Sequence, residues 1–150
     1  MHLEFGAAYR RYSTTISRQF CLGKPTSRLH EIYQVVRDAC DACIAEIRAG
    51  VPATRPHEAA KKVIADAGMD EYRLHTTGYG IAPGYPPSWG EYIHLFADST
   101  YTLEAGMVLS VESPVFIHKE NLGVRIIDNV LVTESGAEIL SGFSRDLICI

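Results

Sequence analysis

The stretch from Gly106 to Leu140 constrains the fold more than any other part of the chain. Its apolar residues, many of them β-branched, come in short runs bounded by Gly, Asn and polar turn residues, and runs of this kind are typical of strands. The predicted elements are a strand over 108–111, a loop over 118–123, a strand over 124–132 and, after a tight turn, a short strand over 137–140. We therefore expect an antiparallel hairpin that is extended by a third strand.

Glu112 stands where the first of these strands ends, two residues before Pro114. A charged side chain in such a strand costs free energy unless it is paired or takes part in function. Two interpretations follow, and they are compatible. Glu112 is a site residue, or it forms a buried ion pair with Arg125 across the hairpin.

Two strands and two helices are predicted ahead of the hairpin. The strands cover 3–9 and 13–22. The first helix runs from Thr26, which can cap its first turn, to about residue 50, and its apolar residues recur every three to four positions. The second helix covers 55–67, with Thr54 as its cap and a glycine at its end.

Between residues 69 and 102 this regular pattern gives way to glycine, proline and aromatic residues. A long segment of this composition predicts a working loop, because glycine lets the backbone approach a ligand and Tyr or Trp supplies contact area. The alternative is a surface segment held by aromatic packing, in which Trp89 serves the core or an interface. With this loop between the helices and the hairpin, the chain is predicted to be one α+β unit.

Length and charge exclude several classes of function. With 150 residues the chain has the size of one domain. Its 14 basic and 18 acidic residues give no positive field for nucleic acid. No apolar run is long enough to span a membrane, and charged residues interrupt the N-terminal stretch where a signal peptide would be apolar. We expect a cytoplasmic protein that binds neither nucleic acid nor a membrane.

Cys40 and Cys43 form a CxxC motif, but it lies within the first predicted helix and no second such motif accompanies it. Zinc sites need four ligands, usually from two such pairs. The motif therefore predicts two reduced cysteines on the buried side of a helix.

The order of motifs resembles the creatinase/aminopeptidase P/methionine aminopeptidase superfamily, whose fold is called pita-bread. The resemblance rests on segments similar to the family's motifs, which are Gly6 to Tyr9 with Ser17-Arg18, Thr77 to Ala82, Gly106 to Ser113, and Gly123 to Gly136. It implies a partial pita-bread fold of the α+β class, with an antiparallel curved sheet and two helices packed on one face. It also implies that residues 1–150 are a single truncated peptidase-like domain without the N-terminal domain and the first half of the catalytic domain.

Metallopeptidases of this superfamily hold two divalent ions with two Asp, one His and two Glu. The resemblance places those five ligands at positions of which only two carry carboxylates here: Glu4, Thr15, Tyr79, Glu112 and Ile127. A dinuclear site needs bridging carboxylates to offset the repulsion between its cations. We therefore predict no tight metal binding. If the protein is a metallopeptidase after all, the metal would be Mn, Co or Zn.

Some members of the superfamily act without metal, creatinase and ectoine hydrolase-like proteins among them, and the second group resembles this chain more particularly. The segment Tyr85 to Glu91 is similar to the Y-P-P-x-W-G-E pattern of the ectoine hydrolase-like group. This resemblance implies metal-independent hydrolysis of a C–N bond in a small zwitterionic amide or amidine. It implies catalytic roles for Glu112 and Glu4, and substrate contacts from the residues Tyr79, Tyr85, Trp89, His75 and Arg125.

Two alternatives remain open. One is an X-Pro aminopeptidase or prolidase-type metallopeptidase, which would act on short peptides. The other is a catalytically inactive fragment with a binding or self-association role. Members of the superfamily generally form homodimers, and a half-fold leaves apolar surface to cover, so we expect a homodimer.

Overall fold

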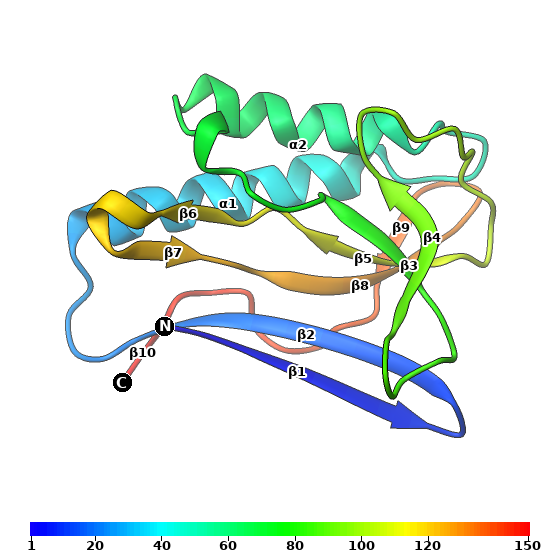
Figure 1. The fold of residues 1–150 in the computed structure, drawn as a ribbon, viewed down its shortest axis with the longest axis horizontal. Coiled ribbons are helices and arrows are strands. Elements are labelled where there is room, and N and C mark those ends of the chain that lie inside the picture. Colours follow the sequence, from blue (N-terminus) through cyan, green and yellow to red (C-terminus); the bar gives the residue numbers. More distant parts are fainter.

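The computed structural model describes residues 1–150, and it shows two helices on one face of a strongly curled antiparallel sheet (Figure 1). The helices are α1 (Ser27–Glu46) and α2 (Thr54–Asp66). The strands of the main sheet follow the order β1-β2-β8-β5-β3-β4. Their bounds are His2–Tyr9 (β1), Tyr12–Cys21 (β2), Gly78–Ile81 (β3), Gly90–Leu95 (β4), Val108–Glu112 (β5) and Ile127–Val132 (β8). The expected α+β fold, with an antiparallel curved sheet and two helices packed on one face, is thus confirmed.

Shorter elements complete the chain. Two extend the main sheet, β9 (Ala137–Ile139) beside β8 and β10 (Ile148–Cys149) parallel to β2. Two others, β6 (Val115–Ile117) and β7 (Leu122–Val124), form a separate hairpin. Single 3-10 turns lie at Asp70–Tyr72 and His118–Glu120.

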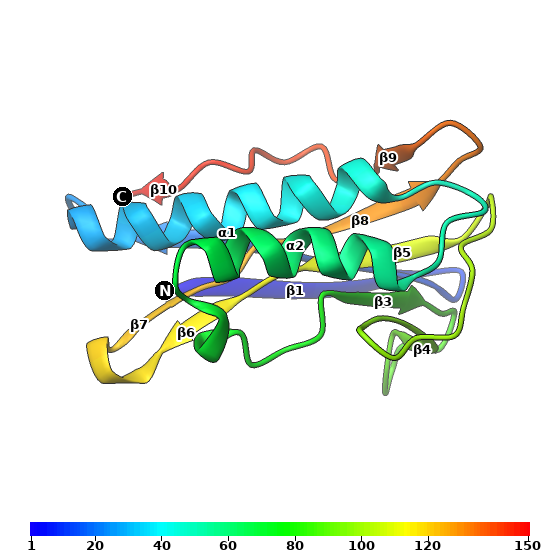
Figure 2. The ribbon, with the colours of Figure 1, turned by 90° about the horizontal axis from the view of Figure 1, so that it is seen from above.

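The core lies between the helices and the face of the sheet that they cover. Seen from above, both helices lie over the strands (Figure 2). Helix α1 buries one full side, including Ile32, Val36 and Cys43, against sheet residues such as Leu109 and Val130. Thr26 accepts a hydrogen bond from the Leu29 amide at 3.1 Å, which confirms its predicted role as the helix cap. Both CxxC cysteines are buried and free, as predicted. Neither helix is apolar enough over a sufficient length to cross a membrane.

Several predictions of local structure are wrong. The strand predicted over 124–132 is two strands of different sheets, β7 and β8, separated at residues 125–126. Thr54 lies inside α2, whose N-cap is Ala53 and has no side-chain cap. The segment 118–123 is not a plain loop, because β6 and β7 form a hairpin there around a 3-10 turn that ends at Asn121 in the left-handed conformation. The long working loop over 69–102 contains strands β3 and β4.

The glycines of β3 explain the last error. A Cβ on Gly78 would lie 2.1 Å from the Ser110 carbonyl oxygen, so close strand packing requires glycine there. Glycine suggests a loop in the sequence, but in this strand it allows the neighbouring chain to approach.

Candidate functional site

Four residues from four neighbouring strands form one continuous row across the sheet. Glu4 of β1 pairs with Ser17 of β2, Ser17 pairs with Ile127 of β8, and Ile127 pairs with Glu112 of β5. Residues directly opposite each other in antiparallel strands place their side chains on the same face. The two carboxylates predicted to be catalytic therefore lie on one face, at the two ends of the row. This face is the inner, concave one, because Leu109 and Val111 on the other face of β5 belong to the core under the helices.

A second row lies two residues further along each strand. It contains Gly6 opposite Thr15, and Ser110 opposite both Asn129 and Tyr79. The Thr15 amide donates to the Asn129 side-chain oxygen at 2.9 Å, which joins the two halves of this row. The five positions that the resemblance assigned to metal ligands thus all lie in these two adjacent rows.

Glu112 is fully buried, and both of its carboxylate oxygens have partners. Ser110 Oγ donates to Oε1 at 3.0 Å. Arg125 donates to Oε2 through Nε at 2.9 Å and also through Nη2. The predicted ion pair across the hairpin is therefore present.

Arg125 also joins the two carboxylates to each other. Its Nη1 lies 3.0 Å from Glu4 Oε2, while its Nε and Nη2 contact Glu112. Glu4 is partly exposed, and its second oxygen forms no hydrogen bond with the protein. Two carboxylates around one guanidinium leave one net negative charge at the centre of the concave face.

Tyr79, Tyr85 and Trp89, predicted to contact substrate, form one aromatic group. The Trp89 Nε1–H donates to the Tyr79 hydroxyl at 3.0 Å, and the Trp89 and Tyr85 ring centroids lie 4.9 Å apart. Burial and the negative charge of Glu112 raise the pKa of Tyr79. Its hydroxyl therefore keeps its proton at neutral pH and can donate it to a hydrogen bond.

His75 lies at the margin of this group. Its Nδ1 is 3.7 Å from Glu112 Oε2 and 2.9 Å from the Thr76 carbonyl oxygen, and its side chain is about one-third exposed. This geometry places His75 close enough to Glu112 for an electrostatic contact.

Three polar residues of the two rows were not predicted as site residues. Thr15, Ser17 and Asn129 are buried, and Thr15 Oγ1, Ser17 Oγ and Asn129 Nδ2 have no hydrogen-bond partner. Nothing in the sequence marks Asn129, while the resemblance puts Thr15 at a metal-ligand position and the alternation in β2 puts Thr15 and Ser17 on one face. That alternation shows that they share a face, but not that the face also carries Glu4.

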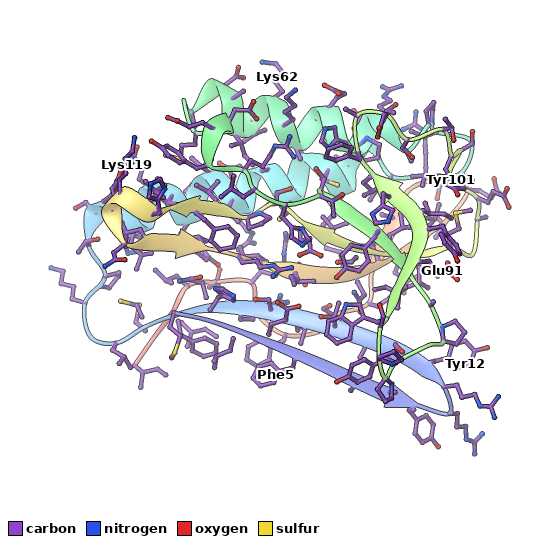
Figure 3. The ribbon with its side chains drawn as sticks, in the orientation of Figure 1. Phe5, Tyr12, Lys62, Glu91, Tyr101 and Lys119 are labelled. Atoms are coloured by element: carbon purple, nitrogen blue, oxygen red, sulfur yellow. The ribbon has the colours of Figure 1, made fainter.

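A pocket of about 250 Å³ lies at one end of the concave sheet. Tyr12 at the β1–β2 turn and Glu91 on β4 line it, and Figure 3 shows both at that end. Ser13, Ile81 and Val108 lie in the same lining. These three belong to the next row after that of Thr15 and Tyr79, so the pocket adjoins the aromatic group.

The sequence matches the metallopeptidase family M24 over residues 1–134. The chain belongs to this family. It is 36% identical over 146 residues to an uncharacterized peptidase, YqhT, of Bacillus subtilis, covering 97% of this chain and 40% of that protein. It is 32% identical over 148 residues to the Xaa-Pro dipeptidase of Pyrococcus furiosus, again covering 97% of this chain and 40% of the relative.

A solved dipeptidase from Pyrococcus horikoshii OT3 has the same fold, with a TM-score of 0.92 and 32% identity. The superposition covers 99% of this chain and 40% of that one. The chain thus spans about 40% of the length of the M24 relatives that it matches. The partial pita-bread fold implied by the motifs is confirmed by this likeness.

The residues at the M24 metal positions do not fit a dinuclear metal centre. Thr15, Tyr79 and Ile127 replace three of the five expected ligands, and an isoleucine side chain has no donor atom. Arg125 lies between the two remaining carboxylates and neutralises charge that a metal ion would need. No group of three or more His, Cys, Asp or Glu side chains in the structure is arranged to hold an ion. No step of the chemistry below depends on a metal.

Proposed function

We propose that this M24 chain carries the substrate site of a hydrolase that cleaves a C–N bond in a small zwitterionic amide or amidine without a bound metal. The proposal rests mainly on the Glu4–Arg125–Glu112 cluster on the concave face. A guanidinium is held between the two carboxylates that the resemblance assigns to metal-ligand positions. The cluster retains acid–base groups while it lacks the donor set for two cations.

Glu4 is the better placed of the two carboxylates to act as the general base. Its second oxygen is available to a water molecule, whereas both oxygens of Glu112 are engaged. Glu4 takes a proton from the attacking water, the hydroxide adds to the amide or amidine carbon, and the C–N bond breaks as the proton passes to the leaving nitrogen. Tyr79 donates to the charge that develops on the intermediate. Glu112 fixes the position of Arg125, and so of Glu4.

The second candidate is an Xaa-Pro dipeptidase, and the named relatives favour this substrate class over creatine or ectoine. The Pyrococcus furiosus relative and the Pyrococcus horikoshii structure both carry dipeptidase names. An Xaa-Pro dipeptide is itself a small zwitterion with a cleavable C–N bond. The two candidates therefore differ mainly in the need for Mn, Co or Zn.

A substrate panel with and without metal separates these candidates. The purified chain is assayed with Ala-Pro, ectoine and creatine, each in EDTA and with added Mn²⁺, and its metal content is measured. Turnover in EDTA supports the metal-independent reaction. Two equivalents of bound metal together with Mn²⁺-dependent cleavage of Ala-Pro establish the dipeptidase instead. No turnover under any condition supports the remaining hypothesis, a catalytically inactive chain that binds or self-associates.

We also propose a homodimer. The outer face of the β1–β2 hairpin is not covered by the helices, and Phe5 on it is 58% exposed (Figure 3). Together with Ile16, Phe20 and Phe143 it lines an apolar hollow. Sedimentation over a range of concentrations tests this, and a monomer at all concentrations rejects it.

A further inference from the structure

Trp89 spans the curled sheet from one side to the other. A Cβ on Gly6 of β1 would lie 2.3 Å from the Trp89 ring, so the indole lies directly over that glycine. At its other end the indole N–H donates to Tyr79 of β3. Gly6 and Tyr79 belong to the same row, with Thr15, Asn129 and Ser110 between them. The Trp89 ring therefore covers this row of side chains.

The row under Trp89 and the adjacent row contain buried polar atoms that the protein does not satisfy. Thr15 and Ser17 are fully buried and Asn129 is 2% exposed. The Asn129 oxygen is used, because it accepts from the Thr15 amide and from Thr14 Oγ1 at 2.6 Å, but its Nδ2 has no partner. Thr15 Oγ1 and Ser17 Oγ also lack partners. Buried polar groups are nearly always hydrogen-bonded, so three such atoms on one face need an explanation.

The chemistry of these atoms defines what they can bind. Asn129 Nδ2 can only donate, and the two hydroxyls can donate as well. None of the three carries a charge, and the Glu4–Arg125–Glu112 cluster beside them has one net negative charge. An acceptor oxygen fits the neutral donors, and a positively charged group fits the cluster.

The spacing of the two rows matches a small molecule that carries an acceptor oxygen at one end and a positive charge at the other. Adjacent rows are two residues apart along a strand, which is about 7 Å. Two residues of extended peptide span about the same length. The separation of the two rows therefore matches the length of a dipeptide.

We infer that Thr15 and Asn129 under Trp89, together with Ser17 of the adjacent row, form a neutral hydrogen-bonding subsite that holds the carboxylate of a small zwitterion. The inference rests on the proposed function and assigns to its substrate an orientation, with the cationic or reacting end beside Glu4. Specificity for the carboxylate then comes from uncharged donors, with Trp89 excluding water from them.

Trp89 is the only tryptophan of the chain, so its fluorescence reports on this subsite directly. The dissociation constant of Ala-Pro is measured in EDTA by Trp89 fluorescence and by calorimetry. Acetyl-Ala-Pro-amide, which lacks both charges, is the ligand control. We expect binding of Ala-Pro and no binding of the capped compound. Absence of any Ala-Pro binding at millimolar concentration overturns the inference.

Two substitutions test the donors separately. Asn129→Asp keeps the oxygen that accepts from Thr15 and replaces only the NH₂ donor with an anionic acceptor. Thr15→Val removes only the hydroxyl and keeps the shape. Each is expected to weaken Ala-Pro binding at least tenfold, whereas Thr15→Val leaves the denaturant midpoint unchanged or higher because it removes an unsatisfied buried group. Ser135→Ala, in the exposed turn after β8, is the matched control and is expected to bind as the parent does.

The outcomes separate this inference from the proposed function. Weaker binding in both variants without any turnover supports the subsite and rejects the hydrolase. Turnover with unchanged binding in both variants supports the hydrolase and rejects the subsite.

Discussion

The two faces of the curled sheet carry charged clusters of very different construction. On the face with the helices and the C-terminal segment, Arg18 pairs with Asp128 at 2.7 Å, and Asp128 also pairs with Arg145 at 2.7 Å. On the concave face, Arg125 joins Glu4 and Glu112. Both clusters are built from Arg and carboxylates, so composition alone does not distinguish them.

The difference lies in how the polar groups around each arginine are used. Arg18 employs all five of its N–H donors, four of its hydrogen bonds going to backbone carbonyls such as those of Phe143 and Ser144. It thereby fixes the C-terminal segment to the sheet. Arg125 instead lies beside a carboxylate oxygen and neutral donors without partners. An arginine whose donors are all used, as those of Arg18 are, indicates structure, whereas the neutral donors without partners near Arg125 indicate a place for a ligand.

The largest expected effect comes from breaking the Arg18–Asp128–Arg145 cluster. Asp128→Ala leaves Arg18 and Arg145 without their buried partner, and losing one member of a buried pair typically costs about 3–5 kcal/mol. The free energy of unfolding, measured in urea, is expected to fall by that amount. Asp146→Ala is the control, because Asp146 is exposed and pairs with Arg37 at only 3.4 Å. Equal midpoints for the two variants contradict the structural role of Asp128.

The concave cluster is expected to respond in activity more than in stability. Glu4→Gln removes the general base while keeping the side-chain shape, and loss of such a group typically lowers turnover by about 10²-fold or more. The rate is measured on the substrate that the panel identifies, and the urea midpoint is expected to stay close to that of the parent. Glu104→Gln, at an exposed position away from the cluster, is the control. A midpoint lowered as far as in Asp128→Ala, with turnover retained, makes this cluster structural as well.

A smaller effect tests whether Trp89 covers the concave face. Gly6→Ala places a methyl group where the Trp89 ring lies, so the indole must shift, and overpacking of this kind typically costs about 1–3 kcal/mol. We expect a red shift of the Trp89 fluorescence and a lower urea midpoint. Gly136→Ala, where an added Cβ meets nothing within 4 Å, is the control. An unchanged emission spectrum for Gly6→Ala means that Trp89 does not cover this row.

Much of the helix-covered face could be predicted from the sequence. Its helices and its central strands carry long periodic patterns, and Thr26 is a recognisable cap, so local rules and burial agree there. Strand β3 was missed because Gly78 and Gly80 are required by the close approach of neighbouring atoms. That requirement belongs to tertiary packing and leaves no local pattern.

The concave site could be predicted only in part. Motif resemblance singled out Glu4 and Glu112, and the structure brings both onto Arg125. Thr15 was singled out only as a position where the family has a metal ligand, and Ser17 and Asn129 escaped because hydroxyl and amide side chains are common in strands. Only the register shows that all three lie on the face of Glu4 and Tyr79. Register depends on which strands pair, and β2 pairs with β8 across more than a hundred residues of sequence.

The smallest effect returns to the helix-covered face, where burial raises the pKa of Cys40 to about 12 and that of Cys43 well above its usual range. In the unfolded chain a thiol ionises near pH 8.5. The unfolded state therefore loses its proton first, and the stability that these thiols contribute declines as the pH rises above about 8.5, by about 1.4 kcal/mol per thiol for each further pH unit.

Comparison of urea unfolding at pH 7.5 and pH 9.5 isolates this contribution when the parent is set beside Cys40→Ala. The substitution is expected to reduce the decline by about 1 kcal/mol, whereas Cys149→Ala, at an exposed position, leaves the decline unchanged. Thiol labelling of the folded chain at pH 8 should modify Cys149 and spare Cys40. Rapid labelling of Cys40 contradicts a closed core. Water would then reach the helix-covered side as well, and the two faces would differ less than the structure indicates.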